Sequence, residues 1–250
     1  MSKESRTQPR YIFGRHAAKE ALAAGVPIEK VYLSEKYAQQ LLPALNEKDI
    51  PSEIVSNRKL ESFAKNASHQ GVLLEVAPYA YASLQQILDA AKGENNALIL
   101  VLDHIEDEGN LGAIARTAEV VGASGLIIPN ARAAGIGAGA YKASAGAVAH
   151  LPIAKVPNLA QTLDALKEEG FWIVGATEHA QDTLWEAPLN GRIALVMGSE
   201  KQGIAPLVLK HCDLLTKLPQ VGSIESLNVA QAATVFAYEW MRQSKIKELR

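Results

Sequence analysis

Three polar clusters in this chain each follow an apolar segment that is typical of a buried strand. The first runs from Asp103 to Arg116 (DHIEDEGNLGAIAR), the second from Ile193 to Gly203 (IALVMGSEKQG) and the third from Leu218 to Asn228 (LPQVGSIESLN). Ligands of open parallel α/β sheets bind beyond the carboxyl ends of the strands. The three clusters are therefore where chemistry is expected.

The first cluster contains an amide and a guanidinium that could contact a ligand. Asn110 is expected at a helix start, where its side chain can cap free backbone amides. Arg116 follows two turns later among small alanines, so its guanidinium could be held close to packed backbone. An ion pair with Glu108 or Glu119 on a solvated face would also explain Arg116, and this segment alone favours that simpler interpretation.

The second cluster contains an acid between glycines. Gly198 and Gly203 flank Glu200, and glycines at a strand end let the backbone approach a ligand closely. Glu200 could therefore point into a pocket, and a turn with a solvated glutamate is an equal alternative.

The third cluster leads into an amphipathic helix expected over 227–243. Ser226 is a natural N-cap for that helix, and Asn228 is expected in its first turn. The free amides of a helix start could bind a carboxylate or a phosphate. Capping alone would also account for the serine.

Other familiar catalytic patterns are incomplete or missing. The segment Gly135–Ala140 (GIGAGA) has the form of a dinucleotide fingerprint, but it does not directly follow a strand and no acid stands near residue 160. The six histidines lack the spacing of a zinc site, and no GxSxG element of a serine hydrolase occurs. We therefore expect neither a metal site nor a dinucleotide cofactor.

Strands and helices are expected to alternate along the chain. Strands are predicted at 29–33, 53–55, 71–76, 97–102, 125–128, 171–176, 193–197 and 213–218. Helices are predicted at 15–24, 36–48, 58–65, 84–91, 111–121, 158–169 and 227–243. This alternation predicts an α/β protein whose larger part has a mainly parallel sheet.

Composition places the chain among ordinary globular proteins. Its 250 residues are 48% hydrophobic and 21% charged, enough to bury a core, and the single cysteine, Cys212, rules out an internal disulfide. The polar start over 1–10 lacks the apolar core of a signal peptide and is expected to be a loosely held tail. No apolar stretch reaches the ~18 residues of a membrane span. We expect a soluble, cytoplasmic protein that does not enter membranes.

Two domains with different charge are expected. Residues 1–75 carry 11 Lys/Arg against 9 Asp/Glu, net +2, whereas residues 94–250 carry 13 against 17, net −4. The overall charge of −2 means that a nucleic-acid partner would have to meet a local patch. We expect a small α/β domain over 11–76, a partly ordered linker over 77–93 and a larger domain over 94–250.

In this order and at these distances from the C-terminus, the three clusters resemble the SpoU (TrmH) branch of the SPOUT methyltransferases. The matching segments are NLGAIAR, VMGSEKQGI and LPQVGSIESLNVAQA. YIFGRHAAKEAL near the start and HQGV at 69–72 resemble members with an added RNA-binding domain. The resemblance covers roughly residues 11–245 and is strongest to bacterial guanosine 2′-O-methyltransferases of 23S ribosomal RNA. Three motifs in register are much more specific than one.

The resemblance implies a fold, a cofactor and a set of site residues. It implies a parallel-sheet catalytic domain with a deep trefoil knot, a front domain like the kink-turn-binding ribosomal proteins, a homodimer, S-adenosyl-L-methionine as methyl donor and RNA as substrate. The family's polar active-site positions fall on Asn110, Arg116, Glu200, Ser226 and Asn228. Its donor-binding positions fall on Gly198, Leu218 and Leu227, with Thr177 at the end of an earlier strand. A bulky residue at 198 is then expected to block the donor and leave the fold intact.

The chain departs from the family pattern at two places. Asp107-Glu108-Gly109-Asn110 stands where members commonly have DPxN, which could reshape the entrance to the ribose site, and Ala230 stands where the third motif often continues with serine. A ribose hydroxyl must lose its proton during transfer. Arg116 normally stays protonated, so it could bind a phosphate that takes the proton or act through a perturbed guanidine, and both remain open.

Two points about partners also stay open. Members that act on ribosomal and on transfer RNA share these motifs, and a non-catalytic RNA-binding or ribosome-assembly protein could keep the same fold. The last helix carries Val235, Phe236 and Trp240 and is apolar around much of its circumference. Part of that surface could be covered by a second subunit, with burial in its own domain as the alternative.

Overall fold

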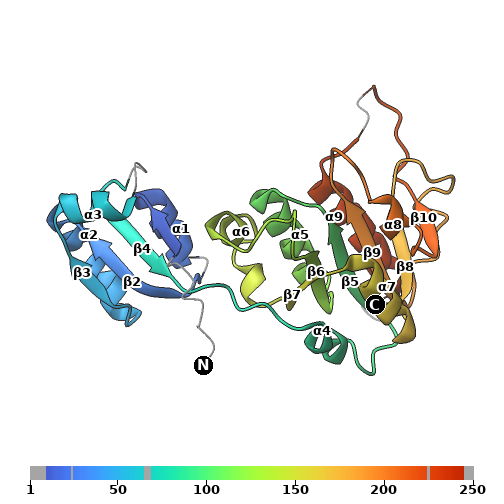
Figure 1. Ribbon diagram of the computed structural model, residues 1–250, viewed down its shortest axis with the longest axis horizontal. Coiled ribbons are helices and arrows are strands. Elements are labelled where there is room, and N and C mark those ends of the chain that lie inside the picture. Colours follow the sequence, from blue (N-terminus) through green and yellow to red (C-terminus); the bar gives the residue numbers. More distant parts are fainter. Residues whose placement is uncertain (1–9, 24, 65–68, 224–225, 245–250) are drawn as a thin grey trace. The chain divides into compact units, whose positions relative to one another are not determined.

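A computed structural model describes residues 10–23, 25–64, 69–223 and 226–244 of the chain. The chain forms two compact units, each with its own sheet (Figure 1). The boundary between them in the sequence lies between Ala80 and Tyr81. Of the tail expected over 1–10, residues 1–9 lie outside the described residues, as do the helix ends expected at Ala24 and Lys65. Arg10 belongs to a strand, so the expected tail is one residue too long.

The first unit is a four-stranded mixed sheet in the order β1-β4-β2-β3. Its elements are β1 (Arg10–Phe13), α1 (Arg15–Ala23), β2 (Ile28–Leu33), α2 (Glu35–Glu47), β3 (Ser52–Ile54), α3 (Asn57–Ala64) and β4 (Val72–Val76). β1 and β2 are antiparallel to β4, and β3 is parallel to β2. The carboxyl ends of β1, β2 and β3 therefore share one edge of the sheet with the start of β4.

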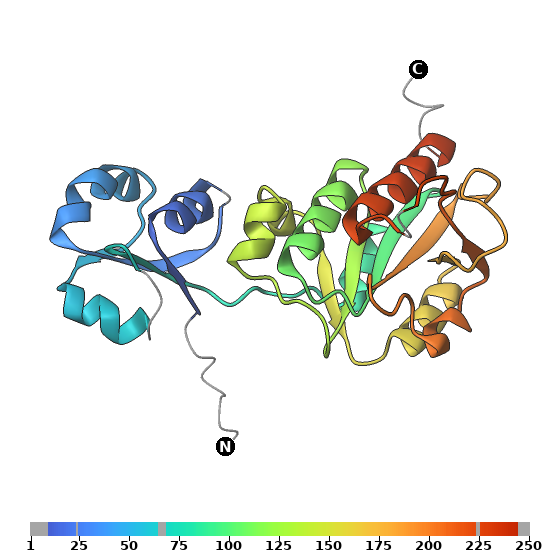
Figure 2. The same ribbon diagram turned by 90° about the horizontal axis from the view of Figure 1, so that it is seen from above.

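Side chains of both sheet faces are buried in this unit. On one face, Leu60 and Phe63 of α3 pack against Tyr32 and Leu73. The other face is covered by α1 and α2 (Figure 2). The expected helices and strands of this unit are confirmed within a residue or two, and β1 is an addition, because four residues are too short for a periodic signal.

The second unit is a six-stranded parallel sheet in the order β10-β8-β9-β5-β6-β7. Its strands are β5 (Ala97–Asp103), β6 (Gly125–Pro129), β7 (Ile153–Val156), β8 (Trp172–Ala176), β9 (Arg192–Gly198) and β10 (Leu214–Thr216). Its helices are α4 (Leu84–Ala90), α5 (Glu108–Val120), α6 (Ala138–Ala143), the 3₁₀ turn η1 (Ala147–Ala149), α7 (Leu159–Glu168), α8 (Pro206–Leu209) and α9 (Val229–Ser244). The expected α/β class with a parallel sheet is confirmed.

Helices cover both faces of this sheet. α4, α7 and α8 pack on one face, and α5, α6 and α9 lie on the other (Figure 2). β5 lies inside the sheet, and Ala97–Leu102 are all buried, as their unbroken apolar sequence predicts. Asp103 at the end of the strand is buried as well. No described helix is both long and apolar enough to cross a bilayer.

Several short elements were not expected from the sequence. These are α6, η1, β7 and α8, each of three to six residues. A helix of this length contains fewer than two turns, so its periodicity cannot be recognised. The apolar residues of β7 could equally belong to a loop that packs on the core, because four residues show no clear spacing.

The segment expected to be a linker contributes to the core of the second unit. Ile87 of α4 is fully buried in the same cluster as Ile99 and Val101 of β5. A capping box between Ser83 and Gln86 fixes the start of α4. Residues from Tyr81 onward are therefore part of the second compact unit.

The last helix buries Phe236 and Trp240 within its own unit. Phe236 and Trp240 are 2% and 1% exposed, and the indole nitrogen of Trp240 donates a hydrogen bond to the Gly191 carbonyl at 3.2 Å. Of the two alternatives left open for this helix, burial in its own domain therefore holds for Phe236 and Trp240, because the helix needs them to cover its own sheet.

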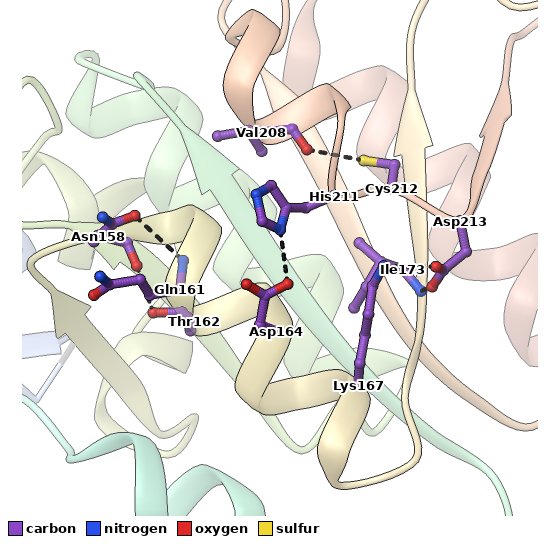
Figure 3. A network of polar contacts seen from close by, with 10 residues as sticks. All are labelled: Asn158, Gln161, Thr162, Asp164, Lys167, Ile173, Val208, His211, Cys212 and Asp213. Carbon is purple, nitrogen blue, oxygen red and sulfur yellow. Dashed lines mark hydrogen bonds and ion pairs between the residues drawn. The ribbon is translucent and has the colours of Figure 1, made fainter.

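A polar network fixes α7 to the loop before β10 (Figure 3). Asp213 accepts a hydrogen bond from the buried Ile173 amide at 2.9 Å and forms an ion pair with Lys167 at 2.7 Å. Next to it, Asp164 contacts His211 at 2.7 Å. Burial and the neighbouring carboxylate of Asp213 raise the pKa of the Cys212 thiol to about 12, so this cysteine stays a neutral packing residue.

Replacing Asp213 with alanine should destabilise the chain by about 1–3 kcal/mol, because the buried Ile173 amide would lose its acceptor. Lys167→Met is the matched control, since it removes only the half-exposed ion pair and should cost about 0–1 kcal/mol. Urea unfolding measures both. Equal losses would show that the amide hydrogen bond is not the stabilising contact.

Candidate active site

The three polar clusters meet at the starts of α5 and α9. The Asn228 side-chain nitrogen donates to Glu200 Oε1 at 2.6 Å and to Asn110 Oδ1 at 2.9 Å. Glu200 Oε1 also accepts from the Val229 amide at 3.2 Å. One residue from each cluster is thereby joined in a single hydrogen-bonded group.

The side chain of Asn228 is fully occupied in this group. Both hydrogens of its amide are donated, and its oxygen accepts from the Ala230 backbone nitrogen at 2.9 Å. Since α9 begins at Val229, Asn228 is the residue that caps it, and the expectation that Ser226 does so is wrong. Asn228 holds its neighbours in place and has no donor left for a ligand.

Asn110 is left with a free donor. The backbone amide of Asn110 donates to Asp107 Oδ1 at 2.7 Å, so Asp107 caps α5 and the expectation that Asn110 does so is wrong. The Asn110 side-chain oxygen accepts from Asn228. Its side-chain nitrogen has no partner among the described residues and is available to a ligand.

The loop after β9 is folded back on itself at glycines. A Cβ atom on Gly198 would lie 2.1 Å from the carbonyl carbon of Gly203 and 2.2 Å from the Ile204 nitrogen. The Gly203 amide donates to the Ser199 carbonyl at 2.8 Å, and Gly203 has a positive φ of 65°. The close approach at Gly198 is therefore to the chain's own backbone, and the expectation that a bulky residue there spares the fold is wrong.

A buried acid that sequence reasoning missed anchors the far end of this loop. Asp103, the last residue of β5, is 0% exposed, and its Oδ2 accepts from the Ala205 amide at 2.7 Å. Its Oδ1 faces Nδ1 of His104, a residue with a positive φ of 60°. An acid directly after an all-apolar strand was the available signal, because a carboxylate in that position is buried only if it has partners.

A pocket of about 290 Å³ lies beside this group, at the carboxyl edge of the sheet. All four expected donor-binding residues line it: Thr177, Gly198, Leu218 and Leu227. Thr177 follows β8, Gly198 ends β9, Leu218 follows β10 and Leu227 precedes α9. The three strands are neighbours in the sheet. Glu200 and Ser226 also line the pocket, and no partner of the Ser226 hydroxyl occurs among the described residues.

Glu108 stands where family members commonly have a proline, and its side chain links α5 to α6. Its Oε2 accepts from the Gly139 amide at 3.0 Å, and a Cβ on Gly137 would lie 2.5 Å from its carboxylate. Gly137 and Gly139 therefore make room for the side chain of Glu108. This explains a glycine-rich segment that lacks the other features of a dinucleotide site.

Arg116 is exposed and stands apart from the hydrogen-bonded group. It lies six residues after Asn110 in α5, which is about 9 Å along the helix axis. In the described part of the chain Arg116 forms no ion pair, and Glu108 is engaged elsewhere. The interpretation of Arg116 as a partner of Glu108 or Glu119 is therefore not supported.

Gly198→Ala should destabilise the chain by about 3 kcal/mol or more, because the added methyl group overlaps backbone that cannot move aside. Gly222→Ala is the control, since a Cβ there meets nothing within 4 Å and should change stability by about 0.5 kcal/mol at most. Thermal and urea unfolding compare the two. Equal stability would contradict the tight packing of this loop.

Comparison with known proteins agrees with this arrangement. The model of the SpoU rRNA methylase family matches residues 97–238, and the model described as RNA 2′-O ribose methyltransferase substrate binding matches residues 11–82. Among solved structures, the SpoU methyltransferase AviRb from Streptomyces viridochromogenes, in complex with the cofactor AdoMet, is 25% identical with a TM-score of 0.71. That alignment covers 96% of this chain and 91% of AviRb.

Sequence relatives cover almost the whole chain. YacO of Bacillus subtilis (strain 168), named as a TrmH family tRNA/rRNA methyltransferase, is 40% identical over 93% of this chain and 95% of its own length. The protein slr0955 of Synechocystis sp. (strain ATCC 27184 / PCC 6803 / Kazusa), named as a tRNA/rRNA methyltransferase, is 38% identical over 93% of this chain and 62% of its own length. With three motifs joined at one sheet edge and matches along nearly its full length, this chain belongs to the SpoU rRNA methylase family.

Proposed function

We propose that this chain transfers a methyl group from S-adenosylmethionine to a ribose 2′-hydroxyl of RNA, with a guanosine of large-subunit ribosomal RNA as its target. The observation that carries this proposal is the hydrogen-bonded group of Asn110, Glu200 and Asn228 beside a pocket lined by the expected donor residues. Family membership supports the reaction class.

The pocket has the chemistry that the donor requires. Leu218, Leu227 and Phe236 give apolar surface for an adenine ring, and Thr177 gives a polar group at the end of β8. The carboxylate of Glu200 lines the same pocket and complements a positive charge. When bound, S-adenosylmethionine supplies an electrophilic methyl group. The related AviRb was crystallised with this cofactor.

The chain's own residues then hold the ribose and its phosphate. The side-chain nitrogen of Asn110 is free to donate to a ribose oxygen, because Asn228 fixes the orientation of that amide. Arg116 is free of carboxylate partners in the described residues, so its planar guanidinium can hold a phosphate next to the reacting hydroxyl. The proton of the hydroxyl passes to that phosphate or, where Arg116 is a deprotonated guanidine, to Arg116, because the guanidinium form has no lone pair to accept it.

The RNA class rests on the family and on the relatives. The family model is named for rRNA, whereas YacO and slr0955 carry names that include both tRNA and rRNA. Transfer RNA is therefore the second candidate substrate. We propose that the first unit selects the RNA, as the substrate-binding match over 11–82 suggests, and that the enzyme acts in the cytoplasm.

The resemblance to the family also implies a knot and a homodimer, and these two features are part of the proposal. We propose the trefoil knot in the segment that carries the donor loops, and a homodimer formed by the second unit. Thr117 of α5 and Thr234 of α9 are in hydroxyl contact at 2.8 Å. One turn beyond them, Val120 and Tyr238 are 57% and 44% exposed. This apolar surface is a candidate for the dimer contact.

The test of the reaction is transfer of labelled methyl groups to ribosomal and transfer RNA, with mapping of the modified ribose. Arg116→Ala should lower the single-turnover rate about 10²–10⁴-fold while donor affinity stays constant, because its interaction matters chiefly in the transition state. Arg116→Lys should rescue little, since an ammonium cannot replace the guanidinium fork. A rate within a few-fold of wild type for the alanine variant would remove Arg116 from the reaction.

For the dimer, Val120→Glu combined with Tyr238→Glu should give a monomer mass by light scattering at micromolar concentration, because two buried charges would oppose association. Leu207→Glu is the control, since Leu207 is 58% exposed on α8, which packs on the opposite face of the sheet from α5 and α9. A wild-type monomer, or a dimer that survives the double substitution, would refute this interface.

A further inference from the structure

The first unit contains a cavity of about 1130 Å³ that the reaction does not use. It lies at the sheet edge where β1, β2 and β3 end and β4 begins. Arg15 from the first family-like segment and Gln70 from HQGV are both in its wall. Two segments that are 55 residues apart in sequence thus fold into one concave surface.

Arg15 is held in a fixed position at this wall. Its guanidinium stacks on the ring of Tyr37, 4.2 Å from the centroid, and its Nε donates to the Gln70 carbonyl at 3.2 Å. Its backbone amide donates to the Gln70 side chain at 3.3 Å. The two terminal nitrogens have no partner among the described residues. An arginine oriented in this way loses little conformational freedom when it binds an anion.

Polar groups next to Arg15 are also unused. Ser34 is only 9% exposed and precedes α2, yet its hydroxyl makes no capping hydrogen bond. Gly71, with a positive φ of 84°, leaves space for that hydroxyl, because a Cβ at Gly71 would lie 2.5 Å from it. Nδ1 of His69 accepts from the Gly71 amide at 3.0 Å, so the neutral ring carries its proton on Nε2.

The opposite wall is partly apolar. Ile54 is 50% exposed at the end of β3, an unusual position for a large aliphatic side chain with a core nearby. Asn57 and Glu61 of α3 line the same wall and could hydrogen-bond to the edge of a base. Lys36 adds a second cation.

These groups match the three parts of a nucleotide. We propose that this cavity binds one unstacked nucleotide of the RNA substrate, with its phosphate on Arg15, its base face on Ile54 and its base edge on the polar side chains of α3. The inference rests on the proposed function, since it assumes that RNA is the substrate. The cavity is concave and its cations are balanced by Glu35 and Glu61, which suits a splayed base better than the regular surface of a duplex.

The experiment compares two RNAs on the full-length protein: a short hairpin with a single-stranded loop, and the same sequence annealed to its complement. Arg15→Ala should weaken hairpin binding about tenfold or more and lower the slope of log affinity against log salt by ~0.7, the value for one phosphate contact on a single strand. Ile54→Ser, at an exposed position that the core does not need, should weaken hairpin binding without changing that slope.

Arg58→Ala is the matched control, because Arg58 is an exposed arginine of α3 that does not line the cavity. Its affinity for both RNAs should stay within about twofold of wild type. Duplex affinity should be unchanged in all variants, and saturating RNA should restore the full methylation rate of Arg15→Ala.

Hairpin binding by Arg15→Ala and Ile54→Ser equal to that of Arg58→Ala would overturn the nucleotide site. Equal loss on hairpin and duplex would also overturn it, because Arg15 would then be a general backbone contact. Competition between a free mononucleotide and the hairpin loop would support the site, because the proposal places a single nucleotide in the cavity. A wild type that binds the hairpin through these residues but methylates no RNA would contradict the proposed function and leave the site standing.

Discussion

One oxygen atom, Oε1 of Glu200, sets the geometry of the second unit's site. It accepts from the first amide of α9 and from the side chain of the residue that caps this helix. The loop after β9 and the start of the last helix are thereby held together, and Asn110 is brought in through the same amide. α5 and α9 then run side by side in the same direction, with contacts at their starts and again at Thr117 and Thr234.

The loop that carries Glu200 can hold it in place because both ends of the loop are fixed. At one end Gly198 packs against the backbone of Gly203 and Ile204, and at the other Asp103 accepts from Ala205. Asp103 is enclosed at the end of β5, so the loop is tied to a central strand of the sheet. A site built in this way depends on core packing as much as on its polar residues.

The sequence predicted the parallel sheet, most long elements and the three clusters, because apolar strands and helix boundaries leave strong local signals. The unbroken apolar run Ala97–Leu102 and the amphipathic last helix are examples. Short elements such as β7 were lost, since four residues contain too little periodicity. The roles of single residues were harder, because they depend on atoms far apart in the chain: Glu108 contacts Gly139, and the side chain of Asn228 is held by Asn110 and Glu200. The glycines of 135–140 had the form of a dinucleotide fingerprint without its context, but what Gly137 and Gly139 pack against, the side chain of Glu108, could not be read from the sequence.

Because both side-chain hydrogens of Asn228 are donated, few residues can replace it. Aspartate has nearly the same size and shape, yet it has no hydrogen to donate. With Asn228→Asp, a carboxylate oxygen would take the place of the nitrogen that now lies 2.6 Å from Glu200 Oε1. The same oxygen would also face Asn110 Oδ1, so three acceptors would meet without a hydrogen between them. The isosteric acid would push apart the three segments that the amide joins. Residue 228 is therefore constrained by its hydrogen atoms more than by its volume.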